Sequence, residues 1–220
     1  VGTVSSPSFA NPVLSPFGIP NVGFDAFLAF ADFDNDLDFD VFIGNEAGHT
    51  FYYRNDGNIT SPAFTLVGQN PFGLQRTDGE AAPSAVDLDN DGDFDLLVAE
   101  EFGSTYYYEN IGGPTAPNFA PFIPNPFGLT LLGKEISTNP VDIDNDGDFD
   151  LFVGNNVSHI AYFENIGTAS NPIFKRTTNP FGIENLGDYI SPAFADMDGS
   201  GTLDLLCLLY TSDAADDQAS

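Results

Sequence analysis

The sequence has little positive charge, a single cysteine and no long apolar run. Five Lys and Arg residues stand against 33 Asp and Glu, a formal net charge of -28 over 220 residues. Such a charge repels nucleic-acid phosphates and anionic lipid headgroups, so we expect neither as a partner. No apolar stretch approaches the roughly 20 residues that a membrane-spanning helix needs, which argues against membrane insertion. With only Cys207, the chain cannot form an internal disulfide.

The rest of the composition is that of a folded protein. Hydrophobic residues make up 42% and aromatic residues 14%, too many for a disordered acidic chain. The first ten residues show neither an initiator Met nor a basic-then-apolar signal pattern. We therefore expect the chain to begin inside a longer protein.

Two landmarks recur in one register, every 54 or 55 residues. One is an acidic cluster and the other a Pro-Phe-Gly motif; the clusters begin at Asp32, Asp87, Asp142 and Asp196, and the motif places Phe17, Phe72, Phe127 and Phe181. A period of this length is typical of repeat architectures. The predicted organisation is one repeat module over 1–206, with the end of a unit (1–31), three full units (32–86, 87–141 and 142–195) and the start of another (196–206).

Each unit shows a pattern of short strands. In the third unit, extended segments are predicted at 139–143, 149–154, 159–165 and 172–176, separated by Gly, Asn and Pro, and no stretch shows a helical period. Four strands in roughly 50 residues indicate an all-β fold of β-propeller blades, with a parallel β-helix as the weaker alternative. Propellers usually have about 4–8 blades and three complete units fall short of that number, so the chain is expected to be a fragment, of about four blades, of a larger ring. Aromatic residues that occupy the same place in successive repeats are expected to fill the space between sheets, with a platform for sugars as the alternative. They are Phe51, Tyr52, Tyr53, Tyr106, Tyr107, Tyr108, Tyr162 and Phe163.

The acidic clusters are nine-residue loops that suit a metal ion. In the acidic loops 87–95 and 142–150, acids at positions 1, 3 and 5 converge and Gly at position 6 permits the turn, an all-oxygen set that suits Ca²⁺. Positions 1, 3, 5 and 9 are predicted to ligate through side chains and position 7 through its carbonyl. The candidate ligands are Asp32, Asp34, Asp36, Asp38, Asp40, Asp87, Asp89, Asp91, Asp93, Asp95, Asp142, Asp144, Asp146, Asp148, Asp150, Asp196, Asp198, Ser200, Thr202 and Asp204.

Electrostatics favours an ion over a bare acidic turn. Two carboxylates about 4 Å apart repel by roughly 4 kcal/mol at an effective dielectric constant of 20. A solvated acidic loop without metal is the alternative. Up to four structural Ca²⁺ ions are expected, with the strongest sites at 87–95 and 142–150, because Leu37 replaces Gly in the first loop and Ser200 replaces an acid in the fourth. The apolar residues at position 8, such as Phe39 and Phe149, are expected to anchor each loop to its sheet.

These motifs carry a family likeness. The pattern Asp-x-Asp-x-Asp-Gly-x-x-Asp, a following strand such as Leu151-Phe-Val-Gly154, then Tyr-Phe-Glu-Asn and Gly-Thr, resembles the FG-GAP/VCBS repeats of bacterial surface proteins and of integrin α-subunit propellers. The resemblance implies a seven-bladed propeller with calcium in the loop between the first two strands of a blade. It also implies a secreted or cell-surface protein, found among adhesion modules and domains attached to enzymes.

The functional expectation is a calcium-binding module for adhesion or for binding an extracellular protein or glycan, with the remaining blades of the same chain as further partners. We expect no enzyme; a propeller domain attached to an extracellular glycan- or ester-acting hydrolase is the alternative. Residues 207–217 resemble the translation of an adapter used in sequencing libraries, and 207–220 are expected to be a non-native tail. Without Cys207 the native part would contain no thiol.

Overall fold

Short antiparallel strands make up nearly all the regular structure of the chain. The computed structural model describes residues 11, 14–134, 137–155, 160–177, 181–183 and 190–209. Within these ranges lie fourteen strands and two 3-10 turns, η1 (Pro16–Gly18) and η2 (Pro126–Gly128). No helix in the described part is long and apolar enough to cross a membrane.

The strands form four sheets in which each strand pairs with the next along the chain. The first sheet contains β1 (Phe27–Ala31), β2 (Asp40–Gly44), β3 (Thr50–Asn55) and β4 (Phe64–Gln69). The second contains β5 (Ala81–Val86), β6 (Asp95–Glu100), β7 (Thr105–Tyr108) and β8 (Ile123–Pro124). The third contains β9 (Ser137–Val141), β10 (Asp150–Gly154), β11 (Ile160–Asn165) and β12 (Phe174–Thr177), and the fourth β13 (Ile190–Ala195) and β14 (Asp204–Leu209).

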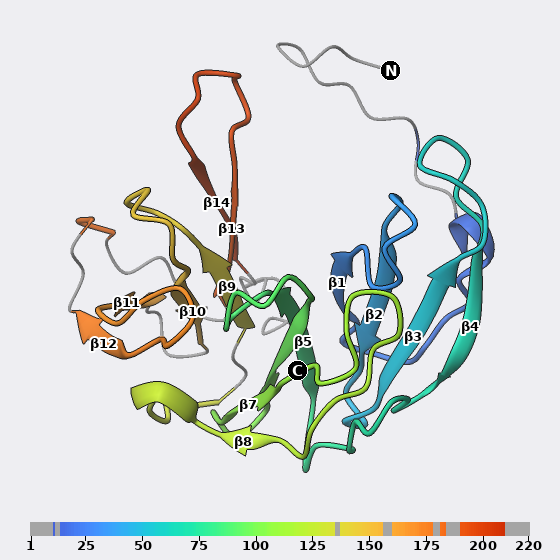
Figure 1. The fold of residues 1–220 in the computed structure, drawn as a ribbon, viewed down its shortest axis with the longest axis horizontal. Helices are drawn as coiled ribbons and strands as arrows, with labels where there is room; N and C mark the ends of the chain where they lie inside the picture. Colours follow the sequence, from blue (N-terminus) through green and yellow to red (C-terminus); the bar gives the residue numbers. More distant parts are fainter. Residues whose placement is uncertain are drawn as a thin grey trace, which may run out of the picture.

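The sheets follow one another around an arc, with the first strand of each sheet innermost (Figure 1). The inner strands β1, β5, β9 and β13 are neighbours in that order. This arrangement confirms the prediction of an all-β propeller fragment of four-stranded blades. Each acidic loop joins the first two strands of its sheet, which is also the place that the family likeness implied.

The strand boundaries differ slightly from those predicted for the third unit. The first strand ends at Val141 rather than at 143, because the turn of the acidic loop starts at Asp142 and Val141 already pairs with Asp150. The last strand is 174–177 rather than 172–176, since Asn171 forms a bridge with Thr168 within the preceding turn. Residue 159 lies outside the described residues.

The core lies between successive sheets. Ala29 and Phe42 are register partners on the face of the first sheet that packs against Leu96 and Val98 of the second. Small side chains on an inner strand let the sheets approach closely near the centre of the arc, where a wedge is narrowest. Of the aromatic residues expected to fill this wedge, Tyr52, Tyr53, Tyr107, Tyr108, Tyr162 and Phe163 are buried, whereas Phe51 and Tyr106 are partly buried.

The last described strand runs past the predicted end of the repeat. In β14, Cys207 pairs with Pro192, Leu208 with Ser191 and Leu209 with Ile190. Residues 210–220 lie outside the described residues, and the non-native origin of the tail stays a prediction.

Candidate metal centre

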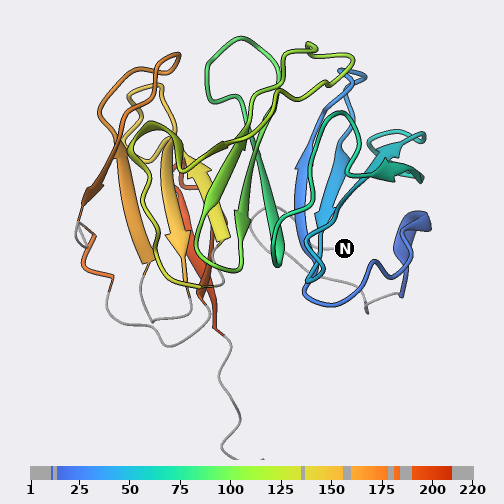
Figure 2. The same ribbon diagram turned by 90° about the horizontal axis from the view of Figure 1, so that it is seen from below.

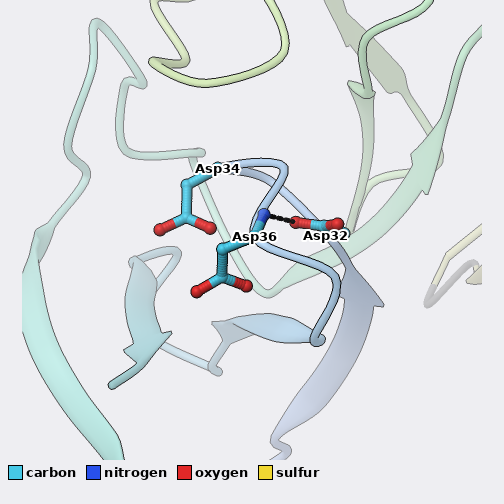
Figure 3. A group of neighbouring side chains, drawn as sticks. All are labelled: Asp32, Asp34 and Asp36. Carbon is cyan, nitrogen blue, oxygen red and sulfur yellow. Dashed lines mark hydrogen bonds between the residues drawn. The ribbon is translucent and has the colours of Figure 1, made fainter. Parts of the chain in front are cut away.

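The first acid of each loop organises the turn. Asp87 Oδ1 accepts a hydrogen bond from the Asp91 main-chain N–H at 3.1 Å, and Asp87 Oδ2 accepts one from Gly92 N–H at 3.0 Å. The same pair of bonds recurs at Asp32 and Asp142. Figure 3 shows the Asp32 bond to the main chain of Asp36. Because these hydrogen bonds all lie within the loop, each turn is folded by its own first carboxylate.

Two positions have left-handed backbone in each of the first three acidic loops, 32–40, 87–95 and 142–150 (the full loops). In the second and third loops, position 4 is Asn with φ of 59° and 61°, and position 6 is Gly with φ of 96° and 95°. Asn and Gly are the residues that tolerate this region best. Leu37 has the same conformation, with φ of 77°, where an L side chain is strained. The expectation that Leu37 occupies the glycine position of the turn is confirmed.

Leu37→Gly will stabilise the first loop. The side chain is 80% exposed, so little apolar burial is lost, while relief of the strained φ will raise the free energy of unfolding by roughly 1 kcal/mol. Urea unfolding with excess calcium measures the gain, and Gly92→Leu is the matched control with the opposite expected sign. A less stable Leu37→Gly protein would contradict this assignment.

Three carboxylates of each full loop lie together. The triads are Asp32, Asp34 and Asp36; Asp87, Asp89 and Asp91; and Asp142, Asp144 and Asp146, each with ligand oxygens within 4.8 Å of one another. Figure 3 shows Asp34 and Asp36 projecting to the same side of the first loop, with Asp32 beside them. The structure thus brings together the predicted positions 1, 3 and 5, in a spacing that can hold a metal ion.

Several buried oxygens next to these triads have no hydrogen-bond partner among the described residues. They belong to positions 3 and 7: Asp34, Asp38, Asp89, Asp93 and Asp148, each through Oδ1. A buried unpaired carboxylate oxygen is costly, and a divalent cation is the partner that removes this cost without a further donor. The residues present therefore fit a cation. Position 7 is buried through its side chain, whereas only its main-chain carbonyl was expected to contribute.

Burial and mutual repulsion disturb the titration of these acids. Burial, followed by repulsion from Asp91, raises the pKa of Asp93 to about 6, and burial with repulsion from Asp146 does the same for Asp148. Burial also raises the pKa of Asp95 to about 7, although three hydrogen bonds oppose that rise. Asp93 and Asp148, which each also have an unpaired buried oxygen, thus behave as acids that lack a counter-ion.

The metal-free protein will lose stability as pH rises. The folded pKa values of Asp93, Asp95 and Asp148 lie near 6–7, above the ordinary 3.8. Between these two pH values the folded state therefore holds more protons than the unfolded state. Stability from these groups is therefore highest below about pH 4 and falls as pH rises toward 7. With a bound cation, stability instead rises as pH rises toward 7, because the cation requires ionised ligands. Melting temperatures at pH 5 and 8, with and without calcium, test this crossover; parallel pH profiles would contradict it.

The ninth acid of each full loop faces the sheet. Asp95 is 1% exposed; its Oδ2 accepts from the Tyr107 hydroxyl at 2.8 Å and its Oδ1 from Asn110 N–H at 2.7 Å. Asp40 and Asp150 have equivalent partners. These partners were missed at the level of sequence, although Tyr and Asn recur 12 and 15 residues after each ninth Asp. Ligation by the ninth acids of these three loops stays a prediction.

The residues at position 8 do not anchor the loops as expected. Phe39 is 65% exposed and Phe149 38%, and only Phe94 packs into the core, with its ring 5.9 Å from that of Phe33. Position 2 provides the anchor instead, since Phe33 and Leu88 are each 2% exposed. Phe39 and Phe149 directly precede the buried first residues of β2 and β10, and because side chains alternate along a strand they face outward. The side chain at position 2 points into the space between sheets.

The fourth loop keeps the two main-chain hydrogen bonds to its first acid, Asp196, but gathers a different triad. Its triad is Asp196, Asp198 and Asp204, so the ninth acid joins the first and third. Ser200 and Thr202 lie at the predicted positions 5 and 7, exposed, with their hydroxyl oxygens 2.7 Å apart. One carboxylate fewer and greater exposure make this a weaker candidate site than the second and third loops.

Comparison with known families identifies the repeat. A family model described as FG-GAP-like repeat matches residues 32–98 and 142–207. Both matches begin at the first acid of an acidic loop, and together they include all four loops. A comparison with curated proteins finds no match to this chain.

Proposed function

The chain belongs to the FG-GAP-like repeat family, and we propose that it is a calcium-binding module of a secreted or cell-surface protein. The observation that carries this proposal is the set of buried, unpaired carboxylate oxygens beside the acidic triads. Calcium accepts about six to eight oxygen ligands in a flexible geometry, whereas Mg²⁺ demands a near-ideal octahedron and keeps several waters. A loop with acids at positions 1, 3, 5, 7 and 9 suits the larger ion.

The role of the ions is structural. In each full sheet, positions 1, 3 and 5 hold the ion, the main chain of the loop is folded around position 1, and position 2 is embedded between sheets. Binding therefore fixes the loop to the core of the blade. Millimolar extracellular calcium fills sites of modest affinity, which supports an extracellular location.

The module acts by binding and not by catalysis. Outside the loops, the buried Glu100 uses both carboxylate oxygens to accept from Phe102 and Ser104 N–H, so this acid closes a turn. The loops between the third and fourth strands present exposed apolar residues, among them Ile59 and Ile111. A protein or glycan of the extracellular space is the proposed partner. Screening the calcium-loaded chain against glycans and matrix proteins, with hydrolase assays in parallel, tests this role; turnover without a partner would contradict it.

The second acidic loop will bind calcium more tightly than the first. Asp89→Ala will therefore cost more affinity than Asp34→Ala, because the strained Leu37 already weakens the first site. Calcium titration of both variants measures the difference, with a larger loss expected from the second-loop change. A larger loss for Asp34→Ala would reverse the ranking.

A further inference from the structure

In the second sheet, one carboxylate connects the acidic loop to the neighbouring hairpin. Besides Tyr107 and Asn110, Asp95 accepts from Leu88 N–H at 3.2 Å, which lies at the second position of the loop. Asp95 thus joins the start of the acidic loop to the end of β7. All three bonds involve a side chain that is almost fully buried, where hydrogen bonds to a carboxylate are strongest.

The chain of contacts continues into the outer loop between β7 and β8. Asn110 Oδ1 accepts from Gly112 N–H at 3.1 Å and from Asn118 N–H at 3.0 Å. One amide oxygen therefore holds both ends of the segment 111–118. A continuous path of hydrogen bonds leads from the acidic loop, through Asp95 and Asn110, to this outer loop.

The first and third sheets repeat the part of the path that runs from the ninth acid to the outer loop. Their tyrosines, Tyr52 and Tyr162, donate to the ninth acids at 2.6 and 2.9 Å. Their asparagines accept from both ends of the corresponding outer loops: Asn55 from Gly57 and Ala63, and Asn165 from Gly167 and Ile173.

The tyrosine ring is itself held by the Pro-Phe-Gly motif. Ring centroids lie 5.3 Å apart for Tyr107 and Phe127, and 5.3 Å for Tyr52 and Phe72. Phe72 and Phe127 have φ of 58° and 56°, a strained conformation for a bulky residue. Backbone strain of this kind persists only where surrounding contacts fix the conformation. Here the strained backbone places the phenylalanine ring against the tyrosine that donates to the ninth acid.

Resting on the proposed calcium function, we propose that Asp95, Tyr107 and Asn110 transmit occupancy of the acidic loop to the outer loop 111–118. Tyr107 is a positioning residue, which fixes the carboxylate without touching the ion. When the cation is absent, repulsion among the loop acids destabilises the acidic loop and with it the hydrogen bonds of this path. When the cation is bound, the acidic loop is fixed and the hydrogen bonds to the outer loop are stabilised. Acidic and outer loops lie on the same edge of the sheets (Figure 2), where Ile111 is 59% and Ile166 53% exposed. Calcium therefore orders the edge that carries these exposed residues.

Hydrogen exchange of the full chain, with and without calcium, tests the path. In the wild type, calcium will slow exchange roughly tenfold or more in both 87–95 and 111–118. In Tyr107→Phe, protection of 111–118 will fall to a small fraction of this, while the outer loops 56–63 and 166–173 stay protected as internal controls of folding. In Asn110→Ala, which keeps the main-chain N–H, 87–95 will remain calcium-protected and 111–118 will not.

The outcomes separate the two claims. Calcium-dependent protection of 87–95 without any in 111–118 overturns the path and leaves the calcium site intact. Equal protection of 111–118 in Tyr107→Phe and wild type overturns the positioning role of the tyrosine. Absence of calcium-dependent protection from 87–95 itself overturns the calcium site and the path together.

Discussion

Removal of calcium will lower the melting temperature of the module by about 15–30 °C. The figure follows from three full sites, each contributing about 2.7 kcal/mol at calcium a hundredfold above its dissociation constant, and from a shift of about 2–4 °C per kcal/mol in a chain of this size. The physical cause is the return of repulsion within each triad and of the unpaired oxygens at positions 3 and 7.

The experiment is a pair of thermal scans, one with millimolar calcium and one after chelation. Magnesium at the same concentration is the control, and it will restore only a small part of the loss because it fits the loop poorly. The chelated protein should recover fully when calcium is returned. Identical melting in both scans would contradict a structural role for the ions.

Asp95→Asn will cost about 3–5 kcal/mol of unfolding free energy in calcium, one of the largest effects of any single substitution in the chain. The amide offers one acceptor where the carboxylate offers two oxygens to Tyr107, Asn110 and Leu88. Its NH₂ group would face N–H and O–H donors in a buried site. The variant therefore leaves donors unpaired and removes a negative charge from the cation loop.

The matched control is Asp204→Asn. Asp204 occupies the same loop position, but it is only partly buried and accepts from Met197 N–H at 3.0 Å. Its replacement should cost less than about 1 kcal/mol. Denaturant unfolding in calcium compares the two variants; equal losses would show that the buried network of Asp95 contributes nothing beyond a loop charge.

The repeat and the metal triads could be predicted because both are written in local sequence. The period of 54 or 55 residues is read directly from the repetition of the motifs, and the spacing of acids at positions 1, 3 and 5 and the glycine at position 6 depend on contacts within a few residues. The turn at Leu37 illustrates this, since its left-handed φ follows from the position alone.

The rest of the site depends on contacts across the sheet. The bond from Tyr107 to Asp95 spans 12 residues and that from Asn110 spans 15. The sequence patterns of β6 and β7 do not specify the pairing register that brings these residues together. The orientation of Phe39 was missed for the same reason, because alternation does not specify which face of a strand meets the next sheet. The recurrence of Tyr and Asn at fixed distances after the ninth Asp of the first three loops was the available signal.

The central claim is that the acidic loops bind calcium, and direct titration of the chelated full chain tests it most simply. Isothermal titration calorimetry should show three to four bound Ca²⁺ per chain, with two tighter sites and little response to Mg²⁺. Asp91 belongs to the triad of the second loop, and the loss of one bound Ca²⁺ in Asp91→Ala would show that the ions bind to the acidic loops. A calorimetric titration without calcium binding at millimolar concentration would contradict the account.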